Sequence, residues 1–295
     1  GFIFSILLGF SLIASLYIAI ALTLSSTIII MKLLSDKNDL GKLYAKISIG
    51  FLLVQDIIAI LLLIFISSFS EDNNIKQPAF ITFIIGIFFI GFLVLLSKYV
   101  LPRLSMFFAK SQEFLFLFAL GWGLGVATFF DYIGLSLEIG ALIAGIILTT
   151  TPYCYEISSK MRPLRDFFII LFFILLGSQI FLGNLSQFLM PLILLSLFVL
   201  AGNPLIMMIL MGVLGYRKRV SFMTGVTTAQ ISEFSLILVA LGVQIGHLQP
   251  EILSFVTLIG LITIGGSSYL ILYSEKLYDL LSPYLDFFER SHLKR

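Results

Sequence analysis

The chain has 295 residues, of which 59% are hydrophobic and 12% are charged, and its formal net charge is +2. Soluble domains carry about 25% charged residues, so this composition excludes a soluble enzyme, a disordered chain and a nucleic-acid-binding domain. The single cysteine, Cys154, excludes an intrachain disulfide and a cysteine metal cluster. The sequence is typical of an integral membrane protein.

Long uncharged stretches predict an all-α bundle, because about 20 apolar residues of helix cross a bilayer. In chain order we expect crossings near residues 11–34, 45–67, 79–100, 112–131, 134–150, 163–182, 188–214, 219–246 and 250–274. Small polar residues at 183–187 divide the long stretch between 163 and 214 at a turn. Asp131 lies at the tip of a predicted hairpin of two short crossings.

The first residue is Gly1, and the chain begins inside an apolar run. We therefore expect an excerpt of a longer protein that lacks the first helices, with residues 1–9 ending an earlier helix.

Basic residues orient the predicted crossings. All of the 18 Lys and Arg residues except Lys76 fall on one side of the bundle, and the positive-inside rule makes that side cytoplasmic. The C-terminus faces the same side. Residues 276–295 are expected to form a cytoplasmic amphipathic tail whose apolar side carries Tyr278, Leu281, Tyr284 and Phe287.

Asp56 is the most informative polar residue, because it lies halfway along a predicted crossing with apolar residues on both sides. An ionised carboxylate at that depth costs several kcal/mol unless it is hydrated, paired or coordinated. Such a group can exchange a proton for a cation. The alternative is a protonated Asp bonded to a neighbouring helix, and the adjacent Gln55 could equally coordinate an ion or only donate a hydrogen bond.

Two further crossings carry dense polar interruptions in mid-membrane. One contains Ser25, Ser26 and Thr27, and the other contains Gln230, Ser232 and Glu233. Such clusters are typical of broken transporter helices, whose backbone carbonyls and helix ends bind ions at the midplane. Glu233 could instead be a structural partner of an unwound helix.

Asn203 precedes Pro204 within another crossing. Proline kinks a helix by removing one backbone hydrogen bond, so Asn203 could serve a functional site or only satisfy a freed carbonyl. Gly140, Ala141, Ala144 and Gly145 are small residues that favour close helix packing.

The order of these motifs resembles the monovalent cation:proton antiporter-2 family, in particular its Kef-type potassium/proton antiporters. The resemblance spans essentially the whole chain. It is carried by Ala21–Thr27, Lys32–Asp36, Phe51–Asp56, Gly134–Gly145, Phe172–Gly177 and Gln230–Phe234.

The resemblance implies an inverted-repeat fold with two broken crossing helices, and alternating access of an elevator type. Asp56 would then bind a monovalent cation, K⁺ or Na⁺, and carry protons. Residues 1–67 and 188–275 would form the ion-transport core of an antiporter domain (1–275), residues 79–100 a linker helix, and residues 112–182 the dimerisation side. The resemblance also implies a homodimer, no cofactor, a prokaryotic inner membrane, and a cytoplasmic nucleotide-binding regulatory domain that is absent here.

Two positions depart from the family pattern. Many relatives place a lysine where this chain has Asn203, and many electrogenic antiporters carry two adjacent acids where it has Gln55 and Asp56. With one acid and no lysine, we expect electroneutral one-for-one exchange.

Other functions are compatible with the same polar residues. They are a channel-like cation pathway and a sodium-coupled solute carrier of related fold. A membrane hydrolase is excluded, because neither a His-Glu-x-x-His nor a Gly-x-Gly-Asp motif is present.

Overall fold

The computed structural model describes residues 1–67, 79–133, 137–178 and 185–288, and every regular element in these ranges is a helix. The chain forms two compact units. The first contains residues 1–59 and 179–295, and the second contains residues 60–178.

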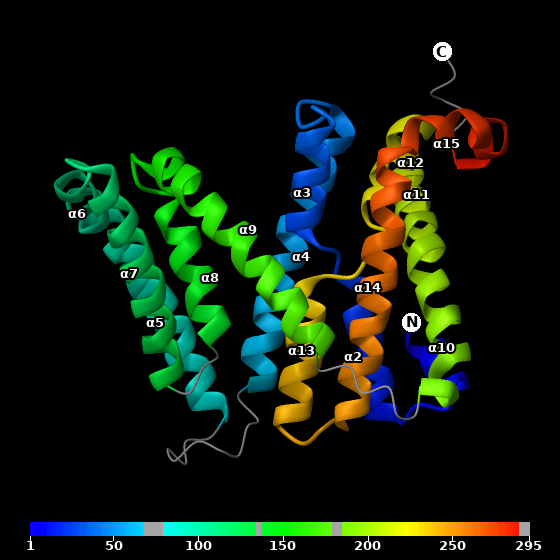
Figure 1. Ribbon diagram of the computed structural model, residues 1–295, viewed down its shortest axis with the longest axis horizontal. Coiled ribbons are helices and arrows are strands. Elements are labelled where there is room, and N and C mark those ends of the chain that lie inside the picture. The colour runs from blue at the N-terminus through cyan, green and yellow to red at the C-terminus, as the bar shows by residue number, and fades with distance from the viewer. Residues whose placement is uncertain (68–78, 134–136, 179–184, 289–295) are drawn as a thin grey trace. The chain divides into compact units, whose positions relative to one another are not determined.

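The first unit is built around two broken helices (Figure 1). Its N-terminal elements are α1 (Phe2–Leu7), α2 (Leu12–Thr23), α3 (Thr27–Asp36) and the larger part of α4 (Leu43–Ser67). Its C-terminal elements are α10 (Leu185–Leu197), the π-helical η1 (Phe198–Gly202), α11 (Asn203–Val213), α12 (Lys218–Thr227), α13 (Glu233–Gln244), α14 (Pro250–Leu272), α15 (Ser274–Leu281) and the 3₁₀ helix η2 (Ser282–Phe288). α2 continues into α3, and α12 into α13, across short non-helical segments.

Local sequence explains where the first helices begin. Gly9 has a positive φ of 90°, a conformation that suits glycine, and it separates α1 from α2. The Ser11 side chain then accepts a hydrogen bond from the Ala14 amide and caps α2. Residues 1–9, which were expected to end an earlier helix, contain the short helix α1.

A buried apolar cluster joins the broken helices to the tail. Ile30 and Leu34 of α3 pack there with Phe222 and Val226 of α12. The further buried members are Tyr44, Ala45, Leu52, Met208, Met223, Ile271 and Leu285. α3, α4, α12 and the tail thus share one core.

The predicted apolar side of the tail is partly packed and partly exposed. Tyr278 packs against the cluster together with Leu277, and its ring contacts Phe222. Leu281 and Tyr284 are exposed. The side chain of Phe287 lies outside those that the structure describes, as do residues 289–295.

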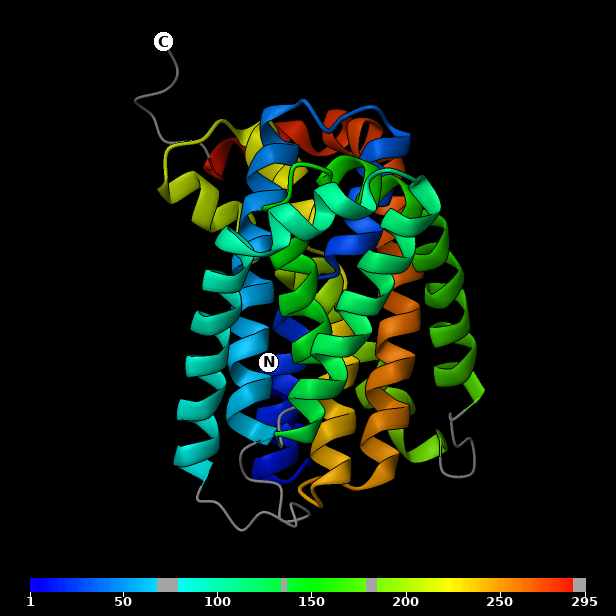
Figure 2. The same cartoon turned by 90° about the vertical axis from the view of Figure 1, so that its left-hand side faces the viewer.

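The second unit contains the remaining helices. They are α5 (Ala79–Tyr99), α6 (Leu101–Phe108), α7 (Gln112–Tyr132), α8 (Leu137–Leu148) and α9 (Cys154–Ser178). α7 and α8 pack side by side (Figure 2), as the predicted hairpin required. α9 begins at Cys154 rather than near 163, because the charged stretch before Pro163 is also helical.

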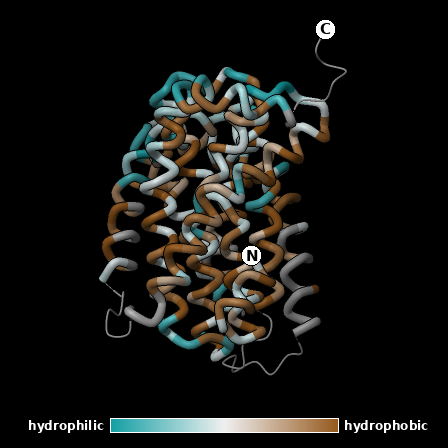
Figure 3. Tube along the Cα trace, turned by 90° about the vertical axis from the view of Figure 1, so that its right-hand side faces the viewer, coloured by the Kyte–Doolittle hydropathy of each residue, from teal (hydrophilic) through white to brown (hydrophobic). Residues whose placement is uncertain are grey.

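Five helical stretches among the described residues are long and apolar enough to cross a membrane: Leu12–Asp36, Leu43–Leu63, Gln112–Tyr132, Leu189–Val213 and Pro250–Leu272. A pair of helices bent by 51°, Gly91–Tyr99 with Leu101–Phe108, gives a sixth span if it is counted as one. Hydrophobic residues follow the helices, and hydrophilic residues gather toward their ends (Figure 3). The chain is thus a multi-pass integral membrane protein.

Candidate functional site

The first broken helix is interrupted at a serine pair. α2 ends at Thr23, Leu24 is extended, and the Ser26 side chain caps α3 by accepting a hydrogen bond from the Ile29 amide at 3.4 Å. Serine is a favoured N-cap residue, so it helps to start a second helix inside the span.

The second broken helix follows the same pattern. α12 ends at Thr227, and the Ser232 side chain caps α13 by accepting from the Phe234 amide at 3.1 Å. Ser235 completes a capping box with Ser232. Both interruptions therefore arise from capping residues in the sequence.

The two breaks lie against each other. The Ser232 amide donates to the Leu24 carbonyl at 2.8 Å. The Ser25 hydroxyl donates to the Thr228 carbonyl at 3.2 Å, and the Gln230 side-chain amide donates to the Ser26 carbonyl at 3.4 Å. The unwound backbone of each helix is thus satisfied by the other.

Two carboxylates lie at this crossing, and each accepts from a hydroxyl of the first break. The Thr27 hydroxyl donates to Asp56 Oδ2 at 2.9 Å, and the Ser26 hydroxyl donates to Glu233 Oε2 at 2.9 Å. The Ser232 hydroxyl also donates to Glu233 Oε2, at 3.4 Å. Thr27 and Glu233 are the first residues of α3 and α13. Glu233 therefore lies at the N-terminus of its own helix, and the carboxylate of Asp56, from the middle of α4, lies beside the N-terminus of α3. The helix dipole stabilises negative charge at such ends.

The carbonyls that the break frees at the end of α2 all have donors. The last four carbonyls of a helix have no partner within it. Ala21 accepts from the Ser235 hydroxyl at 2.6 Å, and Leu22 accepts from the Asn203 amide at 2.9 Å. Thr23 accepts from the Gln55 amide at 2.8 Å. With the Ser232 amide on Leu24, four consecutive carbonyls are satisfied from outside α2.

The three predicted amide ligands therefore bond to the protein itself. Gln55 also accepts from the Ser25 amide at 3.2 Å, so its side chain spans the first break. The Gln230 side chain is fully buried, and its oxygen accepts from the Ser267 hydroxyl at 2.6 Å. The Asn203 side chain donates to a carbonyl of α2. Asn203 is the first residue of α11, directly after the π-helical turn η1.

Three residues at this site, Ser235, Thr263 and Ser267, were not predicted from the sequence. Ser235 had a recognisable signal, because it follows the Ser232 cap by three residues. Ser267 and Thr263 of α14 hold the second break through Gln230 and the Ile231 amide. No local pattern connects them with residues more than 30 positions away.

Other polar residues lie away from this site. Asp131 is exposed at the end of α7. His247 lies between α13 and α14, where its Nδ1 is 2.9 Å from the Tyr17 hydroxyl. The Glu138 side chain and His292 lie outside the described parts. Within those parts, no group of three or more His, Cys, Asp or Glu side chains could hold a metal ion.

The fold and the site define a multi-pass membrane protein in which two broken helices cross beside two carboxylates. The family model described as the transmembrane part of sodium/hydrogen exchangers matches residues 1–272. The chain therefore belongs to the sodium/hydrogen exchanger family, and the antiporter resemblance seen in the motifs is confirmed.

Curated relatives come from plants and bacteria. The K(+) efflux antiporter 4 of Arabidopsis thaliana is 29% identical over 244 residues, which cover 79% of this chain and 41% of the relative. The putative cation/proton antiporter YbaL of Escherichia coli (strain K12) is 26% identical over 301 residues, covering 97% and 52%. The glutathione-regulated potassium-efflux system protein KefC of Salmonella heidelberg (strain SL476) is 28% identical over 238 residues, covering 79% and 38%. The chain spans about half or less of the length of these relatives.

Proposed function

We propose that this chain is the membrane part of a secondary transporter that exchanges a monovalent cation for protons by alternating access, with Asp56 as the exchange site. The observation that carries the proposal is the position of Asp56 at the N-terminus of α3, where Thr27 donates to one carboxylate oxygen. Among the described residues its other oxygen has no hydrogen-bond partner, so it is open to a proton or a cation.

The chemistry of the site suits a hard monovalent cation. Carboxylate, hydroxyl and carbonyl oxygens are the ligands that such ions prefer. Asp56 supplies the carboxylate and Thr27 the hydroxyl. The carbonyls of the first break accept hydrogen bonds, and each keeps a second lone pair that can face a cation. The names of the relatives favour K⁺ over Na⁺.

We propose that the exchange is electroneutral. Ser26 and Ser232 both donate to Glu233, so its carboxylate keeps one protonation state while Asp56 alternates between a proton and a cation. Asn203 cannot titrate. Each loaded form of Asp56 is then neutral, and the membrane potential does no work on the cycle.

We propose different roles for the two compact units. The first unit contains both breaks and Asp56, and we assign it to the moving core of an inverted-repeat transporter. The second unit is assigned to the dimer contact, with α5 as linker. We take the side rich in Lys and Arg as cytoplasmic and place the protein in a prokaryotic inner membrane. In the full-length protein, a nucleotide-binding regulatory domain would act from the cytoplasmic side.

The proposal is tested in proteoliposomes that contain the full-length protein. Gradients of K⁺, Na⁺ or Li⁺ are imposed, and proton movement is followed with a pH-sensitive dye at several clamped potentials. We expect cation-dependent proton movement that does not follow the potential, and its loss in D56N to the level of empty vesicles. D131N, which removes an exposed acid at the end of α7, should keep wild-type exchange.

Two results would contradict the proposal. Near wild-type exchange in correctly inserted D56N would exclude Asp56 as the exchange site. Cation flux without proton movement would indicate the channel-like alternative.

A further inference from the structure

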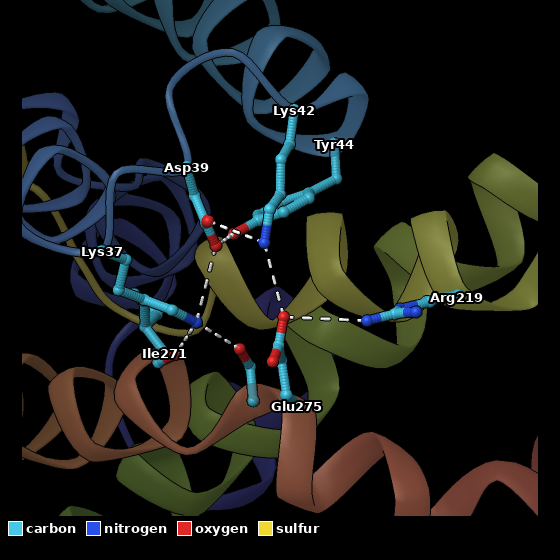
Figure 4. Close-up of polar contacts among 8 residues, drawn as sticks. Lys37, Asp39, Lys42, Tyr44, Arg219, Ile271 and Glu275 are labelled. Carbon is cyan, nitrogen blue, oxygen red and sulfur yellow. Dashed lines mark hydrogen bonds and ion pairs between the residues drawn. The ribbon is translucent and has the colours of Figure 1, made fainter.

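A turn at the C-terminal end of α3 places charged residues against α14. α3 ends at Asp36, and Asn38 adopts a positive φ of 54°. The Asp39 amide donates a hydrogen bond to the Leu34 carbonyl at 2.9 Å, which is a common way to end a helix. Lys37 and Asp39 flank this turn, where Figure 4 shows their side chains.

Lys37 joins α3 to the end of α14. Its side chain is 16% exposed, and its ammonium group donates to the Ile271 carbonyl and to the Ser274 hydroxyl, both at 2.9 Å. Ile271 lies in the last turn of α14, where the helix dipole favours a cation. A charged side chain that is largely buried needs such partners for its charge.

Asp39 completes the connection. It is buried, and it pairs with Lys42 at 2.7 Å and with Lys37 at 3.8 Å while accepting from the Tyr44 hydroxyl. Burial alone would raise the pKa of Asp39, but the hydrogen bonds from Lys42 and Tyr44 hold that pKa below its ordinary value. Asp39 is therefore ionised at neutral pH.

Glu275 extends the network to the second broken helix. Its carboxylate lies 3.4 Å from the Lys42 ammonium group and 3.7 Å from the guanidinium group of Arg219, near the start of α12. These groups are about half exposed, so the pairs are weak. The tighter contacts of Lys37 and Asp39 define what we call the α3 clasp, formed by Lys37, Asp39, Lys42 and Tyr44 with Ile271 and Ser274.

The clasp and the exchange site lie at opposite ends of one helix. α3 runs without interruption from Thr27, which contacts Asp56, to Asp36, next to Lys37. Ten helical residues span roughly 15 Å and behave as a rod. α14 also holds the second break through Ser267. Because Lys37 bonds α3 to the end of α14, α14 contacts the helix that follows the first break as well as the second break itself.

We propose that Lys37 is a positioning residue that sets the place of Thr27 beside Asp56 through the α3 clasp. Its consequence for cation affinity rests on the proposed exchange function, whereas its consequence for the order of α3 does not.

The test compares two lysines at the same end of the protein. K37M removes the clasp contact, and Asp39 keeps Lys42 and Tyr44 as partners, so the variant leaves no unpaired buried acid. K32M removes a lysine whose pair with Asp36 is mostly exposed and serves as control. K37R keeps the charge. For the full-length protein, hydrogen exchange of the first turn of α3 and the half-saturating K⁺ concentration for proton movement are measured.

We expect K37M to raise the half-saturating K⁺ concentration roughly three- to tenfold, which is the effect of losing one typical hydrogen bond. Amide exchange at residues 27–30 should become faster. K32M should match the wild type in both measurements, and K37R should lie closer to the wild type than K37M.

A half-saturating concentration and an exchange rate in K37M that both stay within twofold of wild type would overturn the proposal. Equal effects of K37M and K32M would also overturn it, because they would reflect the general loss of positive charge. If the wild type moved no protons, the exchange function would fail, and hydrogen exchange alone would decide whether the clasp orders α3.

Discussion

Neighbouring hydroxyls at the start of α3 serve different acids: Ser26 donates to Glu233 and Thr27 donates to Asp56. The sequence singled out Asp56, because an acid between apolar residues stands out in any hydropathy pattern. The partners of the two acids could not be predicted, since they depend on how residues about 30 and 200 positions apart meet across the breaks.

Gln55 can be tested as a cation ligand or as a residue that only stabilises the first break through hydrogen bonds. The sequence left both roles open, and the structure shows its amide bonded to the Thr23 carbonyl and the Ser25 amide. Q55L removes both hydrogen bonds, and we expect the free energy of unfolding to fall by about 1–3 kcal/mol. Thermal unfolding of the purified protein in detergent measures this change.

Q55E is the matched control, because a carboxylate can still accept from Ser25 but cannot donate to Thr23. It should unfold between Q55L and the wild type. A Q55L protein that unfolds like the wild type yet has lost cation binding would instead make Gln55 a ligand.

At the scale of the element, the breaks and the hairpin were predictable because their signals are local. Serine caps mark the breaks, and Gly140, one of the small residues of α8, marks the contact between α7 and α8. The bond from Asn203 to the Leu22 carbonyl of α2 was not predictable, because a proline kink indicates only that a carbonyl of the same helix is freed.

Gly140 and Gly145 lie on the same helix in different surroundings. A Cβ at Gly140 would lie 2.8 Å from Ala127 Cα and from Phe130 Cβ, whereas one at Gly145 would have no atom within 4 Å. G140A should therefore lower the free energy of unfolding by about 1–3 kcal/mol, because the α7 backbone has to move away. G145A should leave it unchanged or slightly higher, since alanine favours helix.

Chemical denaturation in detergent micelles measures both variants. Equal stability of G140A and G145A would show that α7 and α8 do not need the close approach at Gly140.

At the scale of the whole molecule, composition established membrane insertion, and motif order indicated the antiporter family. The chain divides into two units, and α4 crosses from one to the other near Ala59. The predicted transport core (1–67 and 188–275), linker helix (79–100) and dimerisation side (112–182) stay predictions. A helix that continues without a break gives no local signal of where one compact unit ends, so the sequence could not place the division near Ala59.

The central claim is that one cation and one proton compete for Asp56. It is tested most directly by measuring proton release when K⁺ is added to the purified full-length protein in weakly buffered detergent solution across a pH series. At acidic pH we predict the release of about one proton per bound K⁺. In that range the K⁺ affinity should fall about tenfold for each unit by which the pH is lowered. D56N should release none, and E233Q should behave like the wild type. Binding of K⁺ without proton release, undiminished release from D56N, or release of two protons would contradict the account.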